Sequence, residues 1–365
     1  MSLARAIPHL LITTAVLGCS GAESDDSEGP FYVGQTLEVV VPYGPGGGTD
    51  TWTRMIAPYL QAGLGEGAGV AVINEPGASG VAGANAYVLR RRPDGLAALA
   101  SSNSTFLSAL LEEPMVRYDF RELSPIVASP GGGVVFLSPS FGVTDPAQLG
   151  SLRGQLVYGG IAASGFDIVP LLAFELLDLD VKAILGYASK GAARIAFEQG
   201  ETNIDYQTMP AYLSNVVPLV DQGLAVPMFS FGLVGPDGSV IRDPSVPELP
   251  TVREVFLAMH GQEPSGPVWD AYHATLVAGV NMAKVLWLHG NAPEAAVRDL
   301  RAAARSMVAD PEFVAKARVE VGNYPFLIGE EIRGLVTRAS QLDPDTRAWL
   351  KSYLKEKFDI DRLGG

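Results

Sequence analysis

The sequence predicts an α/β protein of two domains, each with a mainly parallel sheet flanked by helices. Short apolar runs are repeatedly followed by a polar or glycine-rich loop and then by a segment of helical periodicity, which is the pattern of a covered parallel sheet. The chain has 365 residues, 47% of them hydrophobic, which is enough for two cores. The same loop design occurs twice, at residues 39–50 and 159–167.

The first predicted unit starts with a buried strand at 37–41 and a helix whose apolar residues share one face. These residues are Trp52, Met55, Ile56, Tyr59 and Leu60. The elements that follow are a strand at 70–73, the loop 74–80, a helix ending at Arg92, the turn 93–95, a strand at 96–100 and the polar segment 101–105.

A second unit is predicted to begin at the glycines of residues 129–133, where the chain bends across. Its predicted strands are 134–138, 155–158, 181–185, 204–207 and 226–231, and its predicted helices are 168–177, 192–199 and 212–220. The proline-rich segment 236–250 follows, and the predicted helices of the last third are 294–308, 311–319, 330–339 and 346–357.

The net charge of −14 argues against nucleic acid as a partner, because the phosphate backbone would be repelled. The longest basic run, Arg90-Arg91-Arg92, follows a helical stretch, where cations favour the C-terminal end of the dipole. With Cys19 as the one cysteine, an internal disulfide is excluded. No segment after the N-terminal region has eighteen consecutive apolar residues.

The N-terminal region has the features of an exported chain: one early cation, a short apolar segment and small residues around Cys19. Residues 16–19 resemble a bacterial lipoprotein cleavage box, which makes 1–18 the signal peptide and Cys19 the acylated residue. A plain secretory peptide is the alternative, and the apolar run is too short for a membrane span. Residues 19–35 are predicted to be an acidic flexible tether.

The glycine-rich loop before the first helix predicts an anion site that needs no Lys or Arg. Free amides at a helix start carry partial positive charge and favour a carboxylate or phosphate. Asp50 either caps its helix or holds a bridging water, and both interpretations stay open. A dinucleotide site is disfavoured because Pro45 removes an amide, Thr49 replaces a small residue and Asp50 repels a pyrophosphate.

Nothing in the sequence points to catalysis, a cofactor or a metal. His260, His273 and His289 do not have metal-ligand spacing, and no Gly-x-Ser-x-Gly elbow is present. Ser352 and Lys355 match Ser-x-x-Lys, but they lie on a charged terminal helix without companion motifs.

Four motifs resemble, in order and spacing, those of the substrate-binding proteins of tripartite tricarboxylate transporters, also called Bug receptors or the TctC family. The resemblance covers residues 37–339 and is strongest in the first hundred. The motifs are Val41-Pro42-Tyr43-Gly44-Pro45-Gly46-Gly47-Gly48-Thr49-Asp50, Asn74-Glu75-Pro76-Gly77-Ala78-Ser79-Gly80, Pro93-Asp94-Gly95 and Leu249-Pro250-Thr251-Val252-Arg253-Glu254.

The resemblance implies a two-domain periplasmic-binding-protein fold of type II with the ligand cleft between the domains. Domain 1 is expected at 36–130 and 232–340, domain 2 at 131–231 and a C-terminal helix at 341–365. In relatives, the two glycine loops hold a ligand carboxylate through amides, hydroxyls and two ordered waters. The ligand-binding residues so implied are Tyr43, Gly46, Gly47, Gly48, Thr49, Asp50, Ser79, Gly80, Ser102, Asn103, Ser104, Ala162, Ala163, Ser164, Phe166, Asp167 and Tyr206.

The sequence departs from the family pattern at Leu96-Ala97 after the turn 93–95, at two places on the second wall of the cleft, and in the last third of the chain. Phe166-Asp167 stands where small polar residues or a histidine are usual, and a bulky Phe166 suits an apolar or aromatic ligand tail. Residues 186–191 loosen a Pro-Tyr-Lys-Gly motif, and residues 277–293, with Trp287, are not typical of the family.

The resemblance therefore predicts a periplasmic, lipid-anchored, monomeric receptor. It would capture a small organic carboxylate (a di- or tricarboxylate, an amino acid or an aromatic acid) and deliver it to a tripartite permease. A sensor subunit uncoupled from transport and an exported α/β hydrolase are the alternatives.

Overall fold

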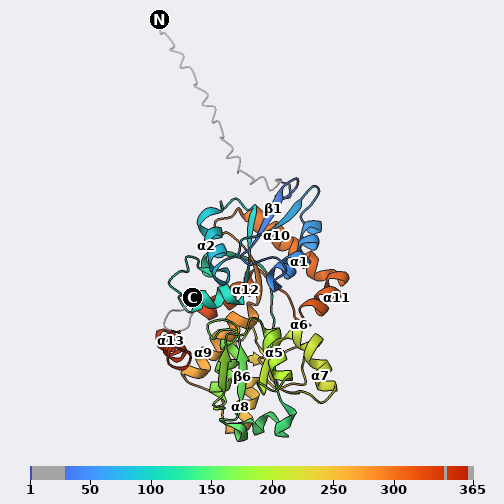
Figure 1. Ribbon diagram of the computed structural model, residues 1–365. Coiled ribbons are helices and arrows are strands. Elements are labelled where there is room, and N and C mark those ends of the chain that lie inside the picture. Colours follow the sequence, from blue (N-terminus) through green and yellow to red (C-terminus); the bar gives the residue numbers. More distant parts are fainter. Residues whose placement is uncertain (2–28, 341–342, 361–365) are drawn as a thin grey trace.

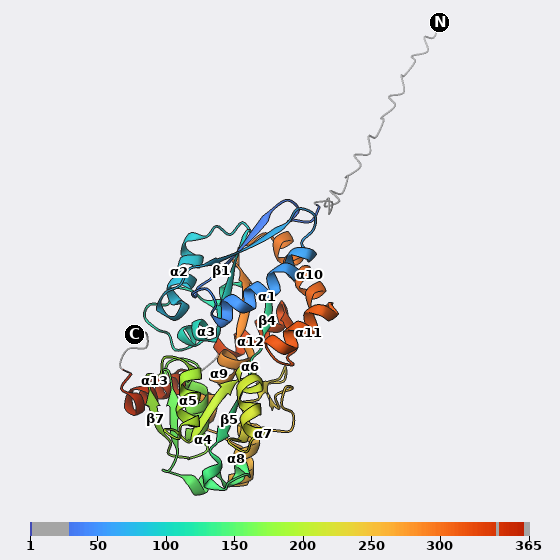
Figure 2. The same cartoon turned by 45° about the vertical axis from the view of Figure 1, so that its right-hand side comes forward.

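The computed structural model describes residues 29–340 and 343–360 together with Met1, and these residues form two lobes, one above the other in Figure 1. Each lobe is built around one sheet with helices on both sides, so the predicted α/β architecture is confirmed (Figure 2). The predicted signal peptide, Cys19 and most of the predicted tether lie outside the described residues. Within the described ranges, no helix is both long and apolar enough to cross a bilayer.

Lobe 1, the upper lobe in Figure 1, contains a six-stranded sheet in the order β13-β4-β12-β3-β1-β2. β1 pairs in parallel with β2 and β3, whereas β12 is antiparallel to β3 and β4, and β13 is antiparallel to β4. The sheet is thus mixed rather than mainly parallel, because β12 enters from the other lobe beside the end of β3. The strands are β1 (Thr36–Val41), β2 (Gly69–Asn74), β3 (Ala97–Ser102), β4 (Ser124–Ser129), β12 (Lys284–Leu288) and β13 (Leu327–Ile328).

Helices cover both faces of this sheet. Alternate residues of β1 point to opposite faces and pack against different helices. Val39 and Val41 belong to a core with α1 and α10, whereas Val40 packs with α2 and α3 on the other face. The predicted apolar face of α1 is buried, with Trp52, Ile56 and Leu60 each no more than 2% exposed. The lobe 1 helices are α1 (Gly48–Gly63), α2 (Val81–Arg90), α3 (Asn103–Leu110), α10 (Glu294–Ala309), α11 (Pro311–Glu320) and α12 (Glu330–Ser340).

Lobe 2 contains a five-stranded mixed sheet in the order β7-β6-β8-β5-β9. β6 pairs in parallel with β7 and β8, and β5 runs antiparallel to β8 and β9. Its strands are β5 (Gly133–Leu137), β6 (Val157–Gly160), β7 (Lys182–Leu185), β8 (Ile204–Thr208) and β9 (Val226–Ser230). Its helices are α4 (Ile168–Leu176), α5 (Lys190–Glu198), α6 (Met209–Ala211), α7 (Val217–Asp221), α8 (Val252–His260), α9 (Pro267–Leu276) and α13 (Pro344–Phe358).

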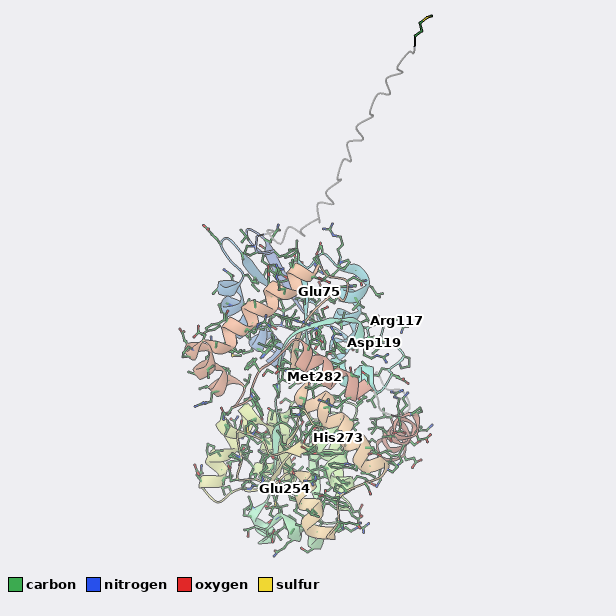
Figure 3. The ribbon with its side chains drawn as sticks, turned by 180° about the vertical axis from the view of Figure 1, so that it is seen from behind. Glu75, Arg117, Asp119, Glu254, His273 and Met282 are labelled. Atoms are coloured by element: carbon green, nitrogen blue, oxygen red, sulfur yellow. The ribbon has the colours of Figure 1, made fainter. Side chains whose placement is uncertain are left out.

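The chain returns to lobe 1 at Lys284, and not at residue 232 as the sequence predicts. α8 packs against the 3₁₀ segment Pro146–Leu152 and β9, and α9 packs against α4. Figure 3 shows Glu254 of α8 and His273 of α9 in lobe 2, with Met282 between the lobes. α13, predicted as a separate terminal helix, packs against α9. The proline-rich segment contains the short pair β10 (Leu233–Val234) and β11 (Val240–Ile241).

The segments that connect the lobes are held together by backbone hydrogen bonds. The first connection runs from β4 to β5 through residues 129–133, and the Gly131 amide donates to the Val280 carbonyl at 2.9 Å. The Gly132 amide donates to the Tyr324 hydroxyl at 2.8 Å, and that hydroxyl donates to Asp243. A side chain at Gly132 would meet Asp243 Oδ2 at 2.1 Å, so the close approach of these segments requires glycine there.

Candidate functional site

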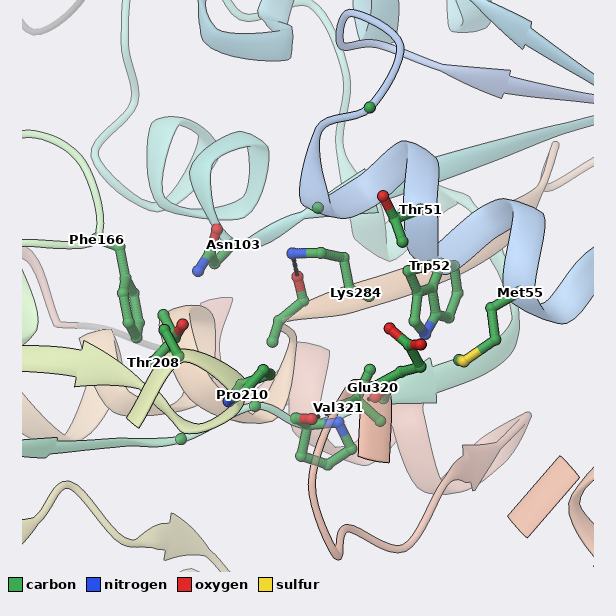
Figure 4. Close-up of a pocket in the computed structure, with 18 residues that line it drawn as sticks. Thr51, Trp52, Met55, Asn103, Phe166, Thr208, Pro210, Lys284, Glu320 and Val321 are labelled. Atoms are coloured by element: carbon green, nitrogen blue, oxygen red, sulfur yellow. Dashed lines mark hydrogen bonds between the residues drawn. The ribbon is translucent and has the colours of Figure 1, made fainter. Parts of the chain in front are cut away.

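Two cavities lie between the lobes and meet at a common set of side chains. The α1 compartment has a volume of about 400 Å³ and is lined by the start of α1, the connection 129–132 and the end of α11. The α4 compartment has a volume of about 480 Å³ and is lined by the loop before α4 and the start of α3. The residues common to both are Asn103, Phe166, Thr208 and Lys284, and Figure 4 shows them beside the α1 compartment.

The first glycine loop is held in shape by Asp50, which is 3% exposed. Its carboxylate accepts hydrogen bonds from the Gly46 amide (2.8 Å), Asn74 Nδ2 (2.9 Å) and Arg54 Nε (3.0 Å). Asp50 therefore caps the loop from the side, and it is held among protein donors rather than facing the cleft. Arg54, together with the Gly46 and Asn74 donors, lowers the pKa of Asp50 to about 2.

We predict that Asp50→Asn lowers stability at neutral pH by on the order of 1–2 kcal/mol, a figure kept small because Arg54 is half-exposed and screened by water. Since the folded pKa lies below the unfolded value near 3.8, this contribution is fully present above pH 3.8 and is lost as the pH falls through about 2. The free energies of unfolding of wild type and Asp50→Asn, measured with urea, should therefore become equal in acid.

The control is Asp221→Asn at an exposed position on α7, which should change stability less. A stability gap between Asp50→Asn and wild type that stays constant from neutral pH to acid would contradict this electrostatic role.

The start of α1 carries donors that the protein does not use. No side chain caps this helix, and the amides of Gly48, Thr49 and Asp50 have no acceptor among the described residues. Gly46 and Gly48 line the α1 compartment, so the open helix end faces the cleft. This is the arrangement in which a helix start binds an anion.

In the second loop, too, an aspartate accepts hydrogen bonds from loop amides, but fewer backbone amides remain free. Asp167 accepts from the amides of Ile161 (2.9 Å) and Ala162 (3.1 Å) and from the Tyr158 hydroxyl. The first amides of α4 also donate to carbonyls of the loop itself. The sequence predicts two facing helix ends that grip one anion, whereas the structure leaves the α1 end open and the α4 end internally paired.

The other two predicted loops are both held against Tyr43 of the first glycine loop. The hydroxyls of Tyr43 and Ser102 share a hydrogen bond of 2.5 Å, and Ser102 caps α3 in a reciprocal box with Thr105. Gly80 has φ +95°, and a Cβ there would be 2.5 Å from the Tyr43 hydroxyl. Tyr43, Gly80 and Ser102 thus support the wall rather than form its surface.

The structure brings ten of the seventeen predicted binding residues to the walls of the two compartments. These ten are Gly46, Gly48, Ser79, Asn103, Ser104, Ala162, Ser164, Phe166, Asp167 and Tyr206. The other seven do not line either compartment, and they are Tyr43, Gly47, Thr49, Asp50, Gly80, Ser102 and Ala163.

A neutralised charge cluster forms the floor of the α4 compartment. Lys190 Nζ donates to Asp205 Oδ1 at 2.6 Å, lies 4.0 Å from Asp167 Oδ1 and sits 4.3 Å from the centre of the Tyr206 ring. Burial raises the pKa of Asp205 to about 6 although Lys190 opposes the shift. Because two carboxylates already surround this ammonium, Lys190 has little charge to offer a ligand.

Lys284 is the site residue that the sequence did not reveal. It is the first residue of β12 and lines both compartments, and its ammonium donates to the Ala283 carbonyl at 3.0 Å. Desolvation lowers its pKa to about 8. The signal in the sequence is the segment 277–293, which is not typical of the family, but its local pattern does not show where Lys284 lies.

The three histidines of the described residues lie away from these walls. His273 Nε2 contacts the Gly238 carbonyl at 2.8 Å, the ring of His260 packs against Phe256, and neither these residues nor His289 line the two compartments. Across residues 29–340 and 343–360, no group of three His, Cys, Asp or Glu side chains is placed to hold a metal ion.

Comparisons with known proteins agree with the motifs. No family model matches the chain. It is 29% identical to the protein BugT of Bordetella pertussis over 231 residues, which is 59% of this chain and 66% of BugT. It is 26% identical to a UPF0065 protein of the same organism over 324 residues, which is 86% of each chain.

Solved structures share the fold. A TctC solute-binding protein from Polaromonas superimposes with a TM-score of 0.65 at 17% identity, covering 88% of this chain and 98% of that one. An R. palustris protein solved with adipate has a TM-score of 0.58 at 18% identity, covering 86% and 97%. In its relatives, its motifs and its fold, the chain is similar to the Bug/TctC family of solute-binding proteins.

Proposed function

We propose that this protein is an extracytoplasmic receptor that captures a small organic carboxylate in the cleft between its lobes and delivers it to a tripartite tricarboxylate-type permease. The observation that carries the proposal is the uncapped start of α1, where the amides are free and the first residue, Gly48, lines the α1 compartment. Oriented amides of this kind bind a carboxylate without a cationic side chain, and binding involves no reaction.

The second wall supplies complementary contacts. The amides of Ala163 and Ser164 have no acceptor among the described residues, and Ser164 lines the α4 compartment together with Ser104 and Asn103. Phe166 lies at the junction of the two compartments, where its ring offers an apolar surface to the carbon skeleton of a ligand. A polar end and an apolar middle fit an organic acid better than an inorganic anion.

The two-lobe architecture supports capture by domain closure. A ligand that touches both walls binds the closed form better and shifts the equilibrium toward it. BugD, a neighbour in fold described as a periplasmic binding protein, supports the extracytoplasmic compartment, and the neighbour solved with adipate supports the type of ligand. Export with lipid attachment at Cys19 is part of the proposal. We expect wild type to fractionate with membranes and Cys19→Ser to be released from them.

The test is a calorimetric screen of the purified protein against monocarboxylates, dicarboxylates, tricarboxylates, amino acids and aromatic acids, with uncharged amides of the same skeletons as controls. We expect at least one acid to bind in the micromolar range or tighter and its amide to bind at least tenfold more weakly. If no acid bound, or if acid and amide bound alike, the proposal would fail.

A further inference from the structure

The cleft contains one ammonium group that the family resemblance does not predict. Lys284 lies at the junction of the two compartments, where the ends of three chain segments meet. In the sheet it is paired with Ser102 at the end of β3 and with Ser129 at the end of β4, so its neighbours on both sides are uncharged. A residue on a paired central strand has a fixed backbone, which suits a binding group.

The backbone before Lys284 is also fixed. The Ala283 carbonyl accepts from the Asn103 amide at 3.2 Å. The side chain of Asn281 bonds both the amide and the carbonyl of Val234. These contacts tie the start of β12 to α3 and to lobe 2, so the ammonium is presented from the connection between the lobes.

The ammonium is half-buried and has no acidic partner. Within the described part of the chain, no carboxylate lies within ion-pair distance of it, and its one protein acceptor is the neutral Ala283 carbonyl. Figure 4 shows its side chain extending toward Asn103, away from Glu320 in the same compartment. Lys190, the other ammonium of the cleft, differs in this respect because Asp205 and Asp167 surround it.

A partly buried cation without an acidic partner is costly, and a ligand that supplies the opposite charge would offset that cost. An unsatisfied donor lies in the same compartment. The indole N–H of Trp52 is buried and has no acceptor among the described residues, and Trp52 is 2% exposed. An ammonium without an acidic partner and an indole N–H without an acceptor, at a wall that also carries the open α1 amides, point to an anionic occupant.

We infer that Lys284 forms the ion pair with a carboxylate of the ligand at the junction of the two compartments, and that it selects organic anions over neutral analogues. The inference rests on the proposed function and adds a charged contact to the amide contacts at α1. It also predicts that a second carboxylate improves binding, because one can lie at α1 and the other at Lys284. Dicarboxylates are then preferred to monocarboxylates of the same length.

Binding should also depend on pH in a way that isolates Lys284. The ammonium form binds the anion, so affinity is full below its pKa near 8 and falls as the pH rises above it. The other charged groups of the two compartments are Glu113, Asp167, Lys190 and Glu320, with the phenol of Tyr206. A Lys284 variant keeps all of them, so any pH dependence that it loses belongs to Lys284.

The experiment is calorimetry of the full chain with succinate, glutarate, adipate, malate, citrate and benzoate between pH 7 and 9.5. Wild type is compared with Lys284→Met, with Lys284→Arg and with Lys316→Met, which makes the same charge change on exposed α11. We expect Lys284→Met to weaken binding of the best acid by about 30-fold or more and Lys316→Met to leave it within about twofold.

For wild type we expect roughly tenfold weaker binding at pH 9.5 than at pH 7, and no such loss for Lys284→Arg, whose charge persists. Acids that bind wild type and Lys284→Met equally would overturn this inference and leave the proposed function standing. If none of the acids bound wild type, both would fail.

Discussion

Replacing Trp287 with alanine is expected to lower the free energy of unfolding by about 3–5 kcal/mol. Trp287 is fully buried on β12, where its neighbours in the sheet are Leu99 on β3 and Pro125 on β4. Its ring lies 5.0 Å from that of Phe120, and its indole N–H donates to Ser101 Oγ at 2.8 Å. Alanine would leave a large cavity at the centre of lobe 1.

The measurement is urea unfolding of the purified variants followed by circular dichroism. Trp287→Phe is the matched control, since it keeps an aromatic ring and loses mainly the hydrogen bond, so it should cost less than the alanine variant. An alanine variant within about 1 kcal/mol of wild type would show that β12 is not the central strand that the structure describes.

The position of β12 could not be predicted from the sequence. Its pairing joins Lys284 to Ser102 and Ser129, and such distant contacts are not encoded by local periodicity. A π-helical turn, Val277–Asn281, ends two residues before the strand, and its irregular period hides where the strand begins. The role of Lys284 depends entirely on this pairing, because a lysine at the start of a short apolar run is otherwise unremarkable in the sequence.

Local sequence patterns correctly predicted the strand, loop and helix that form the α1 side of the site. The strand, loop and helix around α1 follow from an apolar run, glycines and a helical stripe, and the structure has β1 and α1 at those places. The same patterns did not show which donors stay free. Asp167 pairs with its own loop through contacts five and six residues away, which requires a particular loop conformation rather than a particular composition.

The predicted domain boundary at residue 232 differs from the structure for a related reason. A proline-rich segment is typical of a linker, but here it contains β10 and β11, and the next two helices bury apolar residues against lobe 2. Val252 and Tyr272 are fully buried. The sequence shows that α8 and α9 have apolar faces, but not which lobe those faces contact.

Gly48→Glu is expected to weaken carboxylate binding by at least about 100-fold while leaving the fold intact. Gly48 is the first residue of α1, it is exposed, and a Cβ built there meets no atom within 4 Å. A glutamate in the first turn favours the helix by about 0.3–1 kcal/mol. Its carboxylate would occupy the space before the open amides and repel a ligand carboxylate by roughly 4 kcal/mol at 4 Å in an effective dielectric near 20.

Two controls separate the charge from the loss of glycine. Gly48→Ala keeps the amide and adds only a methyl group in open space, so its affinity should stay within a few-fold of wild type. Gly334→Glu adds the same charge on α12, where a Cβ also meets nothing within 4 Å. The measurement is calorimetry with the acid that binds wild type best. If Gly48→Glu bound this acid as tightly as Gly48→Ala does, the amides at the start of α1 would not be the carboxylate site. Lys284 would then have to hold the anion without them.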